Sequence, residues 1–275
     1  MKKSSFVQTV LNSPYIIWSA IFVIVPLLMV IYYAFTNESG DFSLNNIIEI
    51  KDYASTFLLS VGYGAVATFI CLILAYPFAY FLSHSGASFQ RMSIMLVMLP
   101  MWMSFLIRTY SWMTILGDSG LINRFLGLFS IGPAAMLNTP QAVILGMVYN
   151  FLPYMILPLY TVISKMDGSL IEAAQDLGCG KLQTLKKVVL PLSVPGIASG
   201  VTMVFVPSVS TFYITQKLGG GQITLIGDVI EGQFQTAYNY NLGAALSLVL
   251  MVMILICLGV LGYFTDDKDD GGVLM

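Results

Sequence analysis

Residues 172–195 read EAAQDLGCGKLQTLKKVVLPLSVP and form a long polar interval between two strongly apolar blocks. The interval contains Lys181, Lys186 and Lys187, and Lys165 lies just before it. Pro191 and the proline at residue 195 are expected to break the chain before the next apolar block begins. We therefore interpret the interval as a loop, with a short helix of its own, between two membrane-spanning segments.

The start of this loop has the sequence features of a short helix. Ser169 and Glu172 match an S-x-x-E capping box, which predicts that a helix begins near Leu170. Gly178 is placed to end that helix as a C-cap. The predicted helix has about two turns and is roughly 12 Å long.

One face of this predicted helix is apolar and contains small side chains. Leu170, Ala173, Ala174 and Leu177 recur at helical spacing, and the two alanines would let another surface approach closely. A helix this short is marginal by itself, so another surface must hold it. Two roles fit Glu172, a local helix cap and a contact with a docking partner, and they can coexist.

The composition is that of an integral membrane protein. Of 275 residues, 57% are hydrophobic and 9% are charged, and the mean hydropathy is +0.83. Soluble domains have about 25% charged residues. The net charge of −2 gives no indication of nucleic-acid binding. Cys71, Cys179 and Cys257 are far apart in the sequence, which argues against a metal site, and no cofactor is expected.

Six apolar blocks are long enough to cross a bilayer, which takes about 20 residues each. They cover residues 15–35, 57–82, 92–116, 141–163, 196–214 and 242–264. Lipid offers no partner to unpaired backbone groups, so these blocks predict an all-α polytopic membrane helix bundle in one transmembrane domain, residues 1–275.

The orientation follows from the basic residues of the short loops. With the N-terminus inside, the inner segments contain most of them and the outer segments contain few. The inner residues are Lys2, Lys3, Arg91, Lys165, Lys181, Lys186, Lys187 and Lys268, and the outer residues are Lys51, Arg124 and Lys217. Both termini, the loop at about residues 164–195 and the acidic tail at 265–275 are therefore expected to be cytoplasmic.

The loop resembles the signature of permease subunits of ATP-binding-cassette (ABC) importers. Its E-A-A begins at Glu172, and Gly178, Val188 and the pair Leu190-Pro191 follow at the signature's spacing, with Val188 where the family usually has Ile. The resemblance implies the type I importer permease fold and a loop that couples to an ATPase. The coupling residues it implies are Glu172, Ala173, Ala174, Asp176, Leu177 and Gly178.

The third block contains an arginine, Arg108, among aromatic residues. An ionisable residue within a span is costly and is by default a candidate functional residue. Alternatively, Arg108 snorkels to the outer interface, with Tyr110 and Trp112 as interfacial aromatics. Trp102 lies deeper in the block and is less easily explained as an interfacial residue.

Three segments are similar to the spermidine/putrescine importer permeases, and their details fit the first, B-type subunit. The segments are residues 100–123, residues 149–160 (YNFLPYMILPLY) and residues 206–234, which include Phe212-Tyr213 and Leu225 to Ile230. One departure is Gly-Gly-Gly at 219–221, where Gly-Gly and another small residue are expected.

A polyamine is a flexible polycation, so its binding calls for carboxylates and aromatic faces. Trp102, Tyr110 and Trp112 are candidates for the faces, and the resemblance adds Tyr213; Asp118, Asp228 and Glu231 are candidates for charge at the outer mouth. Each candidate also has a structural alternative, as a packing, interfacial or solvated loop residue. No carboxylate lies deep in a block, so a partner subunit is expected to supply any intramembrane acids.

The chain lacks the G-x-x-x-x-G-K-[ST] loop, so it is not expected to be an ATPase or another enzyme. The resemblance implies partners instead: a homologous C-type permease, an ABC ATPase dimer and an extracytoplasmic polyamine-binding protein. It also implies a multi-pass protein of the bacterial cytoplasmic membrane, in contact with lipid and not with nucleic acid.

Rival functions have discriminating features. A permease of the same family for an organophosphonate or a metal complex would be favoured if Arg108 faced a substrate cavity. A stand-alone secondary transporter would show intramembrane acids and inverted repeats, and neither is evident in the sequence. An intramembrane enzyme would need a catalytic constellation within the spans, whereas the single histidine, His84, is expected in a loop.

Overall fold

The computed structural model describes residues 14–15, 17–37, 39–129 and 132–266, with side chains as far as residue 262. Within these ranges the regular structure is helical, apart from one isolated bridge between Thr36 and Phe42, so the predicted all-α class is confirmed. Lys2, Lys3, Lys268 and the tail beyond residue 266 lie outside the described residues. The chain divides into two compact units, which are described separately.

Unit 1 consists of Met1–Ser55 and Val229–Met253. Its helices are the π-helical turn Ala20–Ile24, α2 (Val25–Ala34), α3 (Asn45–Glu49), the 3-10 turn Ile50–Tyr53, the end of α14 (Ile226–Gln235) and the first part of α15 (Tyr240–Asp266). Ala34, Ala244 and Ala245 form its small core. Alanines at this contact let α2 and α15 approach closely.

Two asparagines donate hydrogen bonds to backbone carbonyls at and just beyond the C-terminal end of α2, where a helix lacks its full set of partners. Asn241 Nδ2 donates to the Tyr33 and Thr36 carbonyls at 3.1 and 2.7 Å. Asn46 Nδ2 donates to the Ala34 and Thr36 carbonyls at 3.2 and 2.9 Å. The chain can therefore leave the helix at Thr36 without abandoning buried polar groups.

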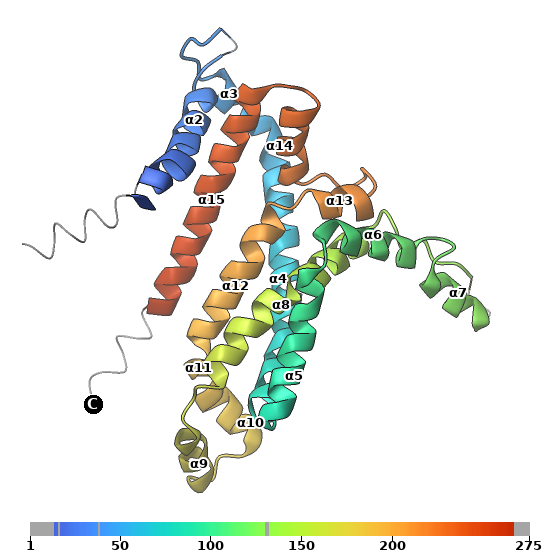
Figure 1. Cartoon of the computed structure of the whole chain (residues 1–275), viewed down its shortest axis with the longest axis vertical. Coiled ribbons are helices and arrows are strands. Elements are labelled where there is room, and N and C mark those ends of the chain that lie inside the picture. The colour runs from blue at the N-terminus through green and yellow to red at the C-terminus, as the bar shows by residue number, and fades with distance from the viewer. Residues whose placement is uncertain (1–13, 16, 38, 130–131, 267–275) are drawn as a thin grey trace, which may run out of the picture. The chain divides into compact units, whose positions relative to one another are not determined.

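Unit 2 consists of Thr56–Asp228 and Ile254–Met275. Figure 1 shows its helices in chain order. They are α4 (Ala54–Ser83), α5 (Ala87–Met98), α6 (Phe105–Leu116), α7 (Leu121–Leu128), α8 (Pro140–Ile163), α9 (Gly168–Asp176), α10 (Lys181–Thr184), α11 (Leu190–Leu192), α12 (Val194–Val209), α13 (Tyr213–Leu218), the start of α14 and the end of α15.

Helix α8 is the centre of unit 2, and small residues let its neighbours approach it. Gly200 of α12 faces Met155 and Pro158 of α8, and Gly146 of α8 faces Ile214 and Leu218 of α13. Close approach at glycine is how membrane helices gain packing energy, because lipid supplies no hydrophobic driving force between them. Helix α8 therefore forms a packed link between its neighbours.

Two of the six predicted spans correspond to bent helix pairs. Four stretches form helices long and apolar enough to cross a membrane: Ile17–Ala34, Asn45–Ser83, Pro140–Ile163 and Tyr240–Gly262. The other two are bent pairs, Ala87–Trp102 with Phe105–Leu128 (92°) and Lys181–Leu192 with Val194–Val209 (65°). The total is six when each bent pair is one span.

The bends have local causes. The predicted third span, 92–116, is not one continuous helix: a 3-10 turn (Leu99–Trp102) contains Pro100, and Met103 and Ser104 have extended backbones. The predicted fifth span, 196–214, also ends early, because α12 stops at Val209 and residue 214 belongs to α13. The other bend, at Ser193, lies between two prolines, where the sequence predicted a break.

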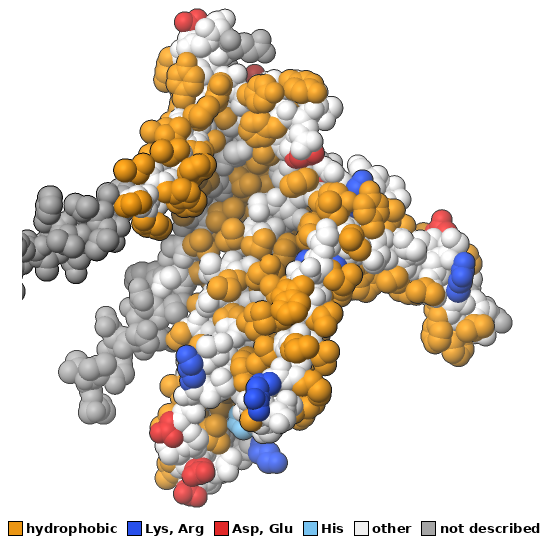
Figure 2. Space-filling view, in the orientation of Figure 1, with side chains coloured by type: hydrophobic (Ala, Val, Ile, Leu, Met, Phe, Trp, Pro, Cys, Tyr) orange, Lys and Arg blue, Asp and Glu red, His pale blue; other side chains and the backbone are white. Residues whose placement is uncertain are grey.

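Hydrophobic side chains cover most of the visible face in Figure 2, and charged side chains of unit 2 gather at the end that carries α9 and α10. Leu58, Phe69, Phe81 and other large hydrophobic residues of α4 point outward and are exposed. An apolar exterior with charge at the ends is the pattern that a bilayer selects.

We predict that Gly64→Val destabilises unit 2. A Cβ at Gly64 would press against the Val209 side chain and lie 3.3 Å from the Val209 nitrogen, whereas a Cβ at Gly62, in the same helix, meets nothing within 4 Å. Overpacking of this kind costs about 1–3 kcal/mol. Thermal unfolding of the detergent-purified protein should show a lower midpoint for Gly64→Val than for Gly62→Val. Equal midpoints would contradict the close contact between α4 and α12.

Candidate functional site

Helix α9 begins at an aspartate that the sequence analysis overlooked. The Oδ1 atom of Asp167 accepts the Ser169 backbone N–H at 3.0 Å, which makes Asp167 the N-cap. The predicted capping box of Ser169 and Glu172 is therefore wrong, because Ser169 already lies within the helix. Asp167 is itself a strong N-cap residue, and its charge favours the positive end of the helix dipole.

The C-terminal end of α9 follows the prediction. Gly178 has φ +83°, its N–H donates to the Gln175 carbonyl at 2.9 Å, and the Cys179 N–H donates to the Ala174 carbonyl at 3.0 Å. These two bonds make a Schellman motif, whose left-handed residue is most easily a glycine. Gly178 thus fixes the length of α9.

The predicted apolar face of α9 is largely exposed. Ala174 points into the protein, but Leu170 is 47% exposed and Leu177 is 86% exposed, and Ala173 is exposed too. Glu172 and Asp176 are also exposed, and Glu172 makes no capping hydrogen bond within the part of the chain described. Exposed leucines beside alanines and carboxylates make a surface suited to docking another protein.

Polar contacts tie the helices together near this loop. Tyr76 of α4 and Ser193, at the bend before α12, are joined by a hydrogen bond of 3.0 Å between hydroxyl groups. Tyr160 of α8 donates to Gln90 of α5 at 2.9 Å. The helices before and after the loop that carries α9 are thus tied to their neighbours, α8 to α5 and the start of α12 to α4.

A second cluster lies where α6 packs on α13. The Tyr110 and Tyr213 rings meet edge to face at 6.2 Å between centroids, and Phe105 lies 6.0 Å from Tyr213. The Lys217 Nζ atom is 5.5 Å from the Tyr110 centroid and 5.6 Å from the Tyr213 centroid. Cations within about 6 Å of an aromatic centroid are attracted to the ring face. We call Phe105, Tyr110, Tyr213 and Lys217 the aromatic cluster.

Arg108 adjoins this cluster and is buried. Its Cζ atom lies 5.9 Å from the Phe105 centroid, and the residue is 7% exposed. Among the described residues, no acceptor bonds its Nε or Nη1 atom. A snorkelling arginine would have an exposed head group, so the burial does not fit that interpretation.

The other predicted path residues do not join the cluster. Trp102 is 79% exposed in the 3-10 turn, Trp112 packs edge to face on Tyr149 of α8 at 5.3 Å, and Asp118 is exposed in the turn after α6. Asp228 accepts the Thr215 hydroxyl at 2.9 Å and the Leu225 N–H at 2.8 Å. Asp228 therefore holds the start of α14 against α13.

The backbone conformation explains the glycines at 220 and 221. Gly220 and Gly221 have φ +55° and +77°, and Asn138 Oδ1 fills the place where a Cβ of Gly220 would lie. The Asn138 N–H also donates to the Leu218 carbonyl at 2.8 Å. Only glycine suits a left-handed backbone pressed this closely by a side chain. The loop that ends α13 is thereby fixed.

The sequence did not single out Phe105. It used Lys217 only as a basic residue of an outer loop, and the contact of Lys217 with the two tyrosine rings was missed. The available signal was spacing: Tyr213 and Lys217 are four residues apart and share one face of a helix. Their contact with Tyr110 was not readable, because it depends on how α6 packs on α13.

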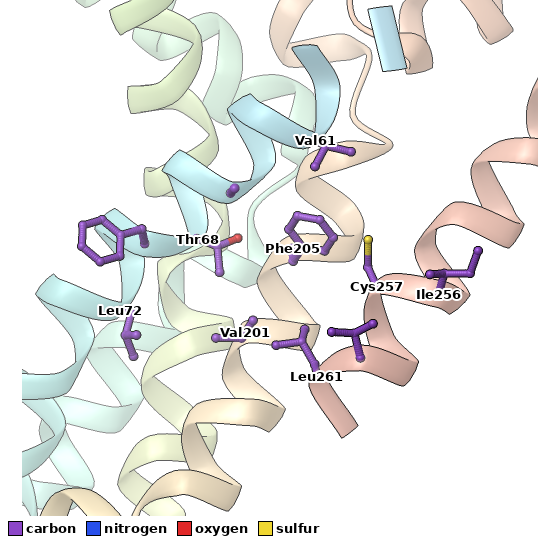
Figure 3. A pocket seen from close by; sticks show the side chains of 11 residues that line it. Val61, Thr68, Leu72, Val201, Phe205, Ile256, Cys257 and Leu261 are labelled. Atoms are coloured by element: carbon purple, nitrogen blue, oxygen red, sulfur yellow. The ribbon is translucent and has the colours of Figure 1, made fainter. Parts of the chain in front are cut away.

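An apolar cavity of about 470 Å³ lies between α4, α12 and the end of α15 (Figure 3). Its lining consists of Val61, Ala65, Thr68, Phe69, Leu72, Val201, Phe205, Ile256, Cys257, Val260 and Leu261. The Thr68 hydroxyl donates to the Gly64 carbonyl of its own helix at 2.7 Å. With no charged side chain, this lining does not suit a polycation.

Comparison with known proteins gives the class of the chain. A family model described as "Binding-protein-dependent transport system inner membrane component" matches residues 1–265, and the chain belongs to this family. It is therefore a multi-pass inner membrane protein of a transport system.

Two curated relatives are spermidine/putrescine transport system permease proteins called PotB. The one from Haemophilus influenzae is 37% identical over 262 residues, 91% of each chain. The one from Escherichia coli (strain K12) is 37% identical over 247 residues, 86% of this chain and 90% of the relative.

Solved structures show the same fold. A bacterial ABC transporter that imports the acidic polysaccharide alginate matches with a TM-score of 0.75 at 17% identity, over 96% of both chains. The alginate transporter in complex with its alginate pentasaccharide-bound periplasmic protein matches with a TM-score of 0.72 at 16% identity, over 95% of this chain and 94% of that one. The predicted importer permease fold is confirmed.

We predict that Asp167→Ala loosens α9 and that Asp167→Asn does not, because asparagine caps nearly as well as aspartate. Hydrogen–deuterium exchange of amides 168–176 in the purified protein should rise several-fold only in the alanine variant. Equal exchange in both variants would contradict the capping role.

The Asp167 cap should also depend on pH. The hydrogen bond from Ser169 holds the pKa of the Asp167 carboxyl below its ordinary value. The charge of Asp167 therefore adds to the stability of α9 fully above the ordinary pKa, and this addition is lost as pH falls through the lowered pKa. Near neutral pH the carboxyl stays ionised, so its titration should not change the protection of α9.

Proposed function

We propose that this chain is the B-type permease subunit of an ABC importer for polyamines, the class that includes spermidine and putrescine. The observation that carries this proposal is its 37% identity, over 91% of its length, to a spermidine/putrescine permease. The exposed docking face of α9 and the cation-bearing aromatic cluster support it.

The proposed partners would supply the functions that an importer needs besides this chain. The chain has no ATP-binding loop, so a dimer of ABC ATPases supplies the energy. A homologous C-type permease completes the path, and an extracytoplasmic binding protein delivers the polyamine. The permease spans the bacterial cytoplasmic membrane with both termini inside, as the distribution of basic loop residues favours.

In this proposal, α9 is the coupling element. Leu170, Ala173 and Leu177 present an exposed apolar surface, and Glu172 and Asp176 add charge beside it. Gly178 ends the helix, and Ala174 attaches it to the permease through its buried side chain. Because α8 and α12 flank the loop and are tied to α5 and α4, closure of the ATPases would move these helices and alternate access to the path.

The proposed substrate path uses aromatic faces. Tyr110 and Tyr213 already hold one ammonium group, so their geometry suits another. Trp102 and Trp112 are further proposed contacts, and Asp118 lies exposed at the outer mouth. We propose that Arg108 and Asp228 support the path indirectly, Arg108 through its contact with the Phe105 ring and Asp228 through the hydrogen bond that it accepts from Thr215.

ATP-driven uptake into vesicles tests this function. Vesicles carrying the permease with its co-encoded partners would receive radiolabelled spermidine or putrescine, with phosphonates as competitors. We expect uptake that needs both ATP and the partners. ATP-dependent uptake of a different solute would contradict the substrate, and uptake by this chain alone on an ion gradient would contradict the permease-subunit role.

We predict that Glu172→Arg abolishes uptake while membrane insertion stays normal. The reversed charge would sit on the exposed docking surface, where the wrong sign costs more than a missing contact. Glu172→Gln is the matched control and should retain more uptake. The measurement is ATP-driven uptake at equal amounts of assembled complex; normal uptake by Glu172→Arg would contradict the docking role of α9.

A further inference from the structure

Lys217 occupies a site that suits a substrate amine. Its side chain is half-buried, and its ammonium lies over two tyrosine rings at once, at 5.5 and 5.6 Å. One ring, Tyr213, comes from its own helix α13, and the other, Tyr110, comes from α6. A lysine side chain ends in four methylenes and an ammonium, which is also the form of an aminobutyl end of an aliphatic polyamine.

Contacts other than Lys217 hold Tyr213 and its helix α13, and Tyr110 meets Tyr213 edge to face at 6.2 Å. Phe105 supports Tyr213 at 6.0 Å, and Ile214 and Leu218, on the other face of α13, are completely buried. Asp228 accepts the hydroxyl of Thr215 and so holds the middle of α13. The two tyrosines therefore form a preorganised cation site, in which Lys217 is the flexible member.

We propose that Lys217 is a tethered competitor for the substrate's ammonium group. In the absence of substrate its ammonium fills the site formed by Tyr110 and Tyr213. A polyamine amine displaces it, because two like charges cannot share one pair of ring faces. This inference rests on the proposed polyamine function and adds a specificity-determining residue to it.

Such a competitor suits a transport path, where binding must be weak enough for release. When the substrate amine leaves, Lys217 returns to the rings, so the aromatic faces do not retain the cargo. The site would discriminate against anionic solutes, since Lys217 and nearby Arg108 both carry positive charge. Lys217 thus lowers the affinity of the site for the polyamine and speeds its release.

The test is the KM for spermidine and putrescine in ATP-driven uptake by the complete complex, with Lys217→Met and Lys217→Arg. Methionine keeps an unbranched chain without the charge, so we expect KM to fall about fivefold, the value of one moderate cation–π contact. Arginine keeps the charge and should leave KM near that of the wild type. An unchanged or higher KM in Lys217→Met, with normal assembly, would overturn the proposal.

Further variants keep the test informative if Lys217→Met does not assemble. Lys217→Gln also removes the charge, and we expect it to lower KM as well. In the Lys217→Gln background, Tyr213→Leu should raise KM again, whereas Tyr213→Phe, which keeps the ring, should not. If Tyr213→Leu and Tyr213→Phe behave alike there, the rings do not bind the amine and the proposal fails.

The wild-type complex separates this inference from the proposed function. Wild-type vesicles that take up no polyamine would contradict the polyamine function and the inference with it. Wild-type uptake that is normal, with a KM that does not respond to loss of the Lys217 charge, would contradict the inference alone.

Discussion

The structure depends on one constraint: in hydrocarbon, every backbone N–H and C=O group must find a partner inside the protein. Helices meet this demand along their length, and the exceptions show how the chain meets it elsewhere. At the end of α2, the amides of Asn46 and Asn241 take the carbonyls that the helix leaves open. At the end of α9, in the loop outside the predicted spans, the Schellman bonds at Gly178 satisfy helix carbonyls with backbone groups alone.

The two candidate regions lie at different ends of unit 2, and α8 connects them (Figure 1). Near its start α8 packs on α13 through Gly146, and near its end it packs on α12 through Gly200 before the chain enters α9. Contacts at glycine bring these helices close together, so they have little room to slide past each other. A displacement of one close-packed helix is therefore transmitted to the next. A tightly packed α8 is what a mechanical link between an ATPase and a distant path requires.

The sequence was sufficient for the class, the apolar blocks and the end of α9, because these depend on composition and on single residues such as Gly178. The sequence placed the start of α9 wrongly. Asp167 and Ser169 are both good N-cap residues, and only the backbone conformation shows that Asp167 is the cap. The break at Met103 was also missed, although Pro100 in the preceding 3-10 turn is a local signal for it. The contact of Lys217 with Tyr110 was missed because it depends on how α6 packs on α13, which local patterns do not encode. The functional roles of the path residues stay predictions.

The fit of Asn138 against Gly220 has a consequence for how this protein can vary. Asn138 itself has a positive φ of 59°, and its side chain occupies the space that any larger residue at 220 would need. Position 220 therefore cannot gain a side chain alone, because it requires a smaller or reoriented neighbour at 138. Across descendants of this gene, a larger residue at 220 should appear only with a change at 138, although the two positions are remote in the sequence.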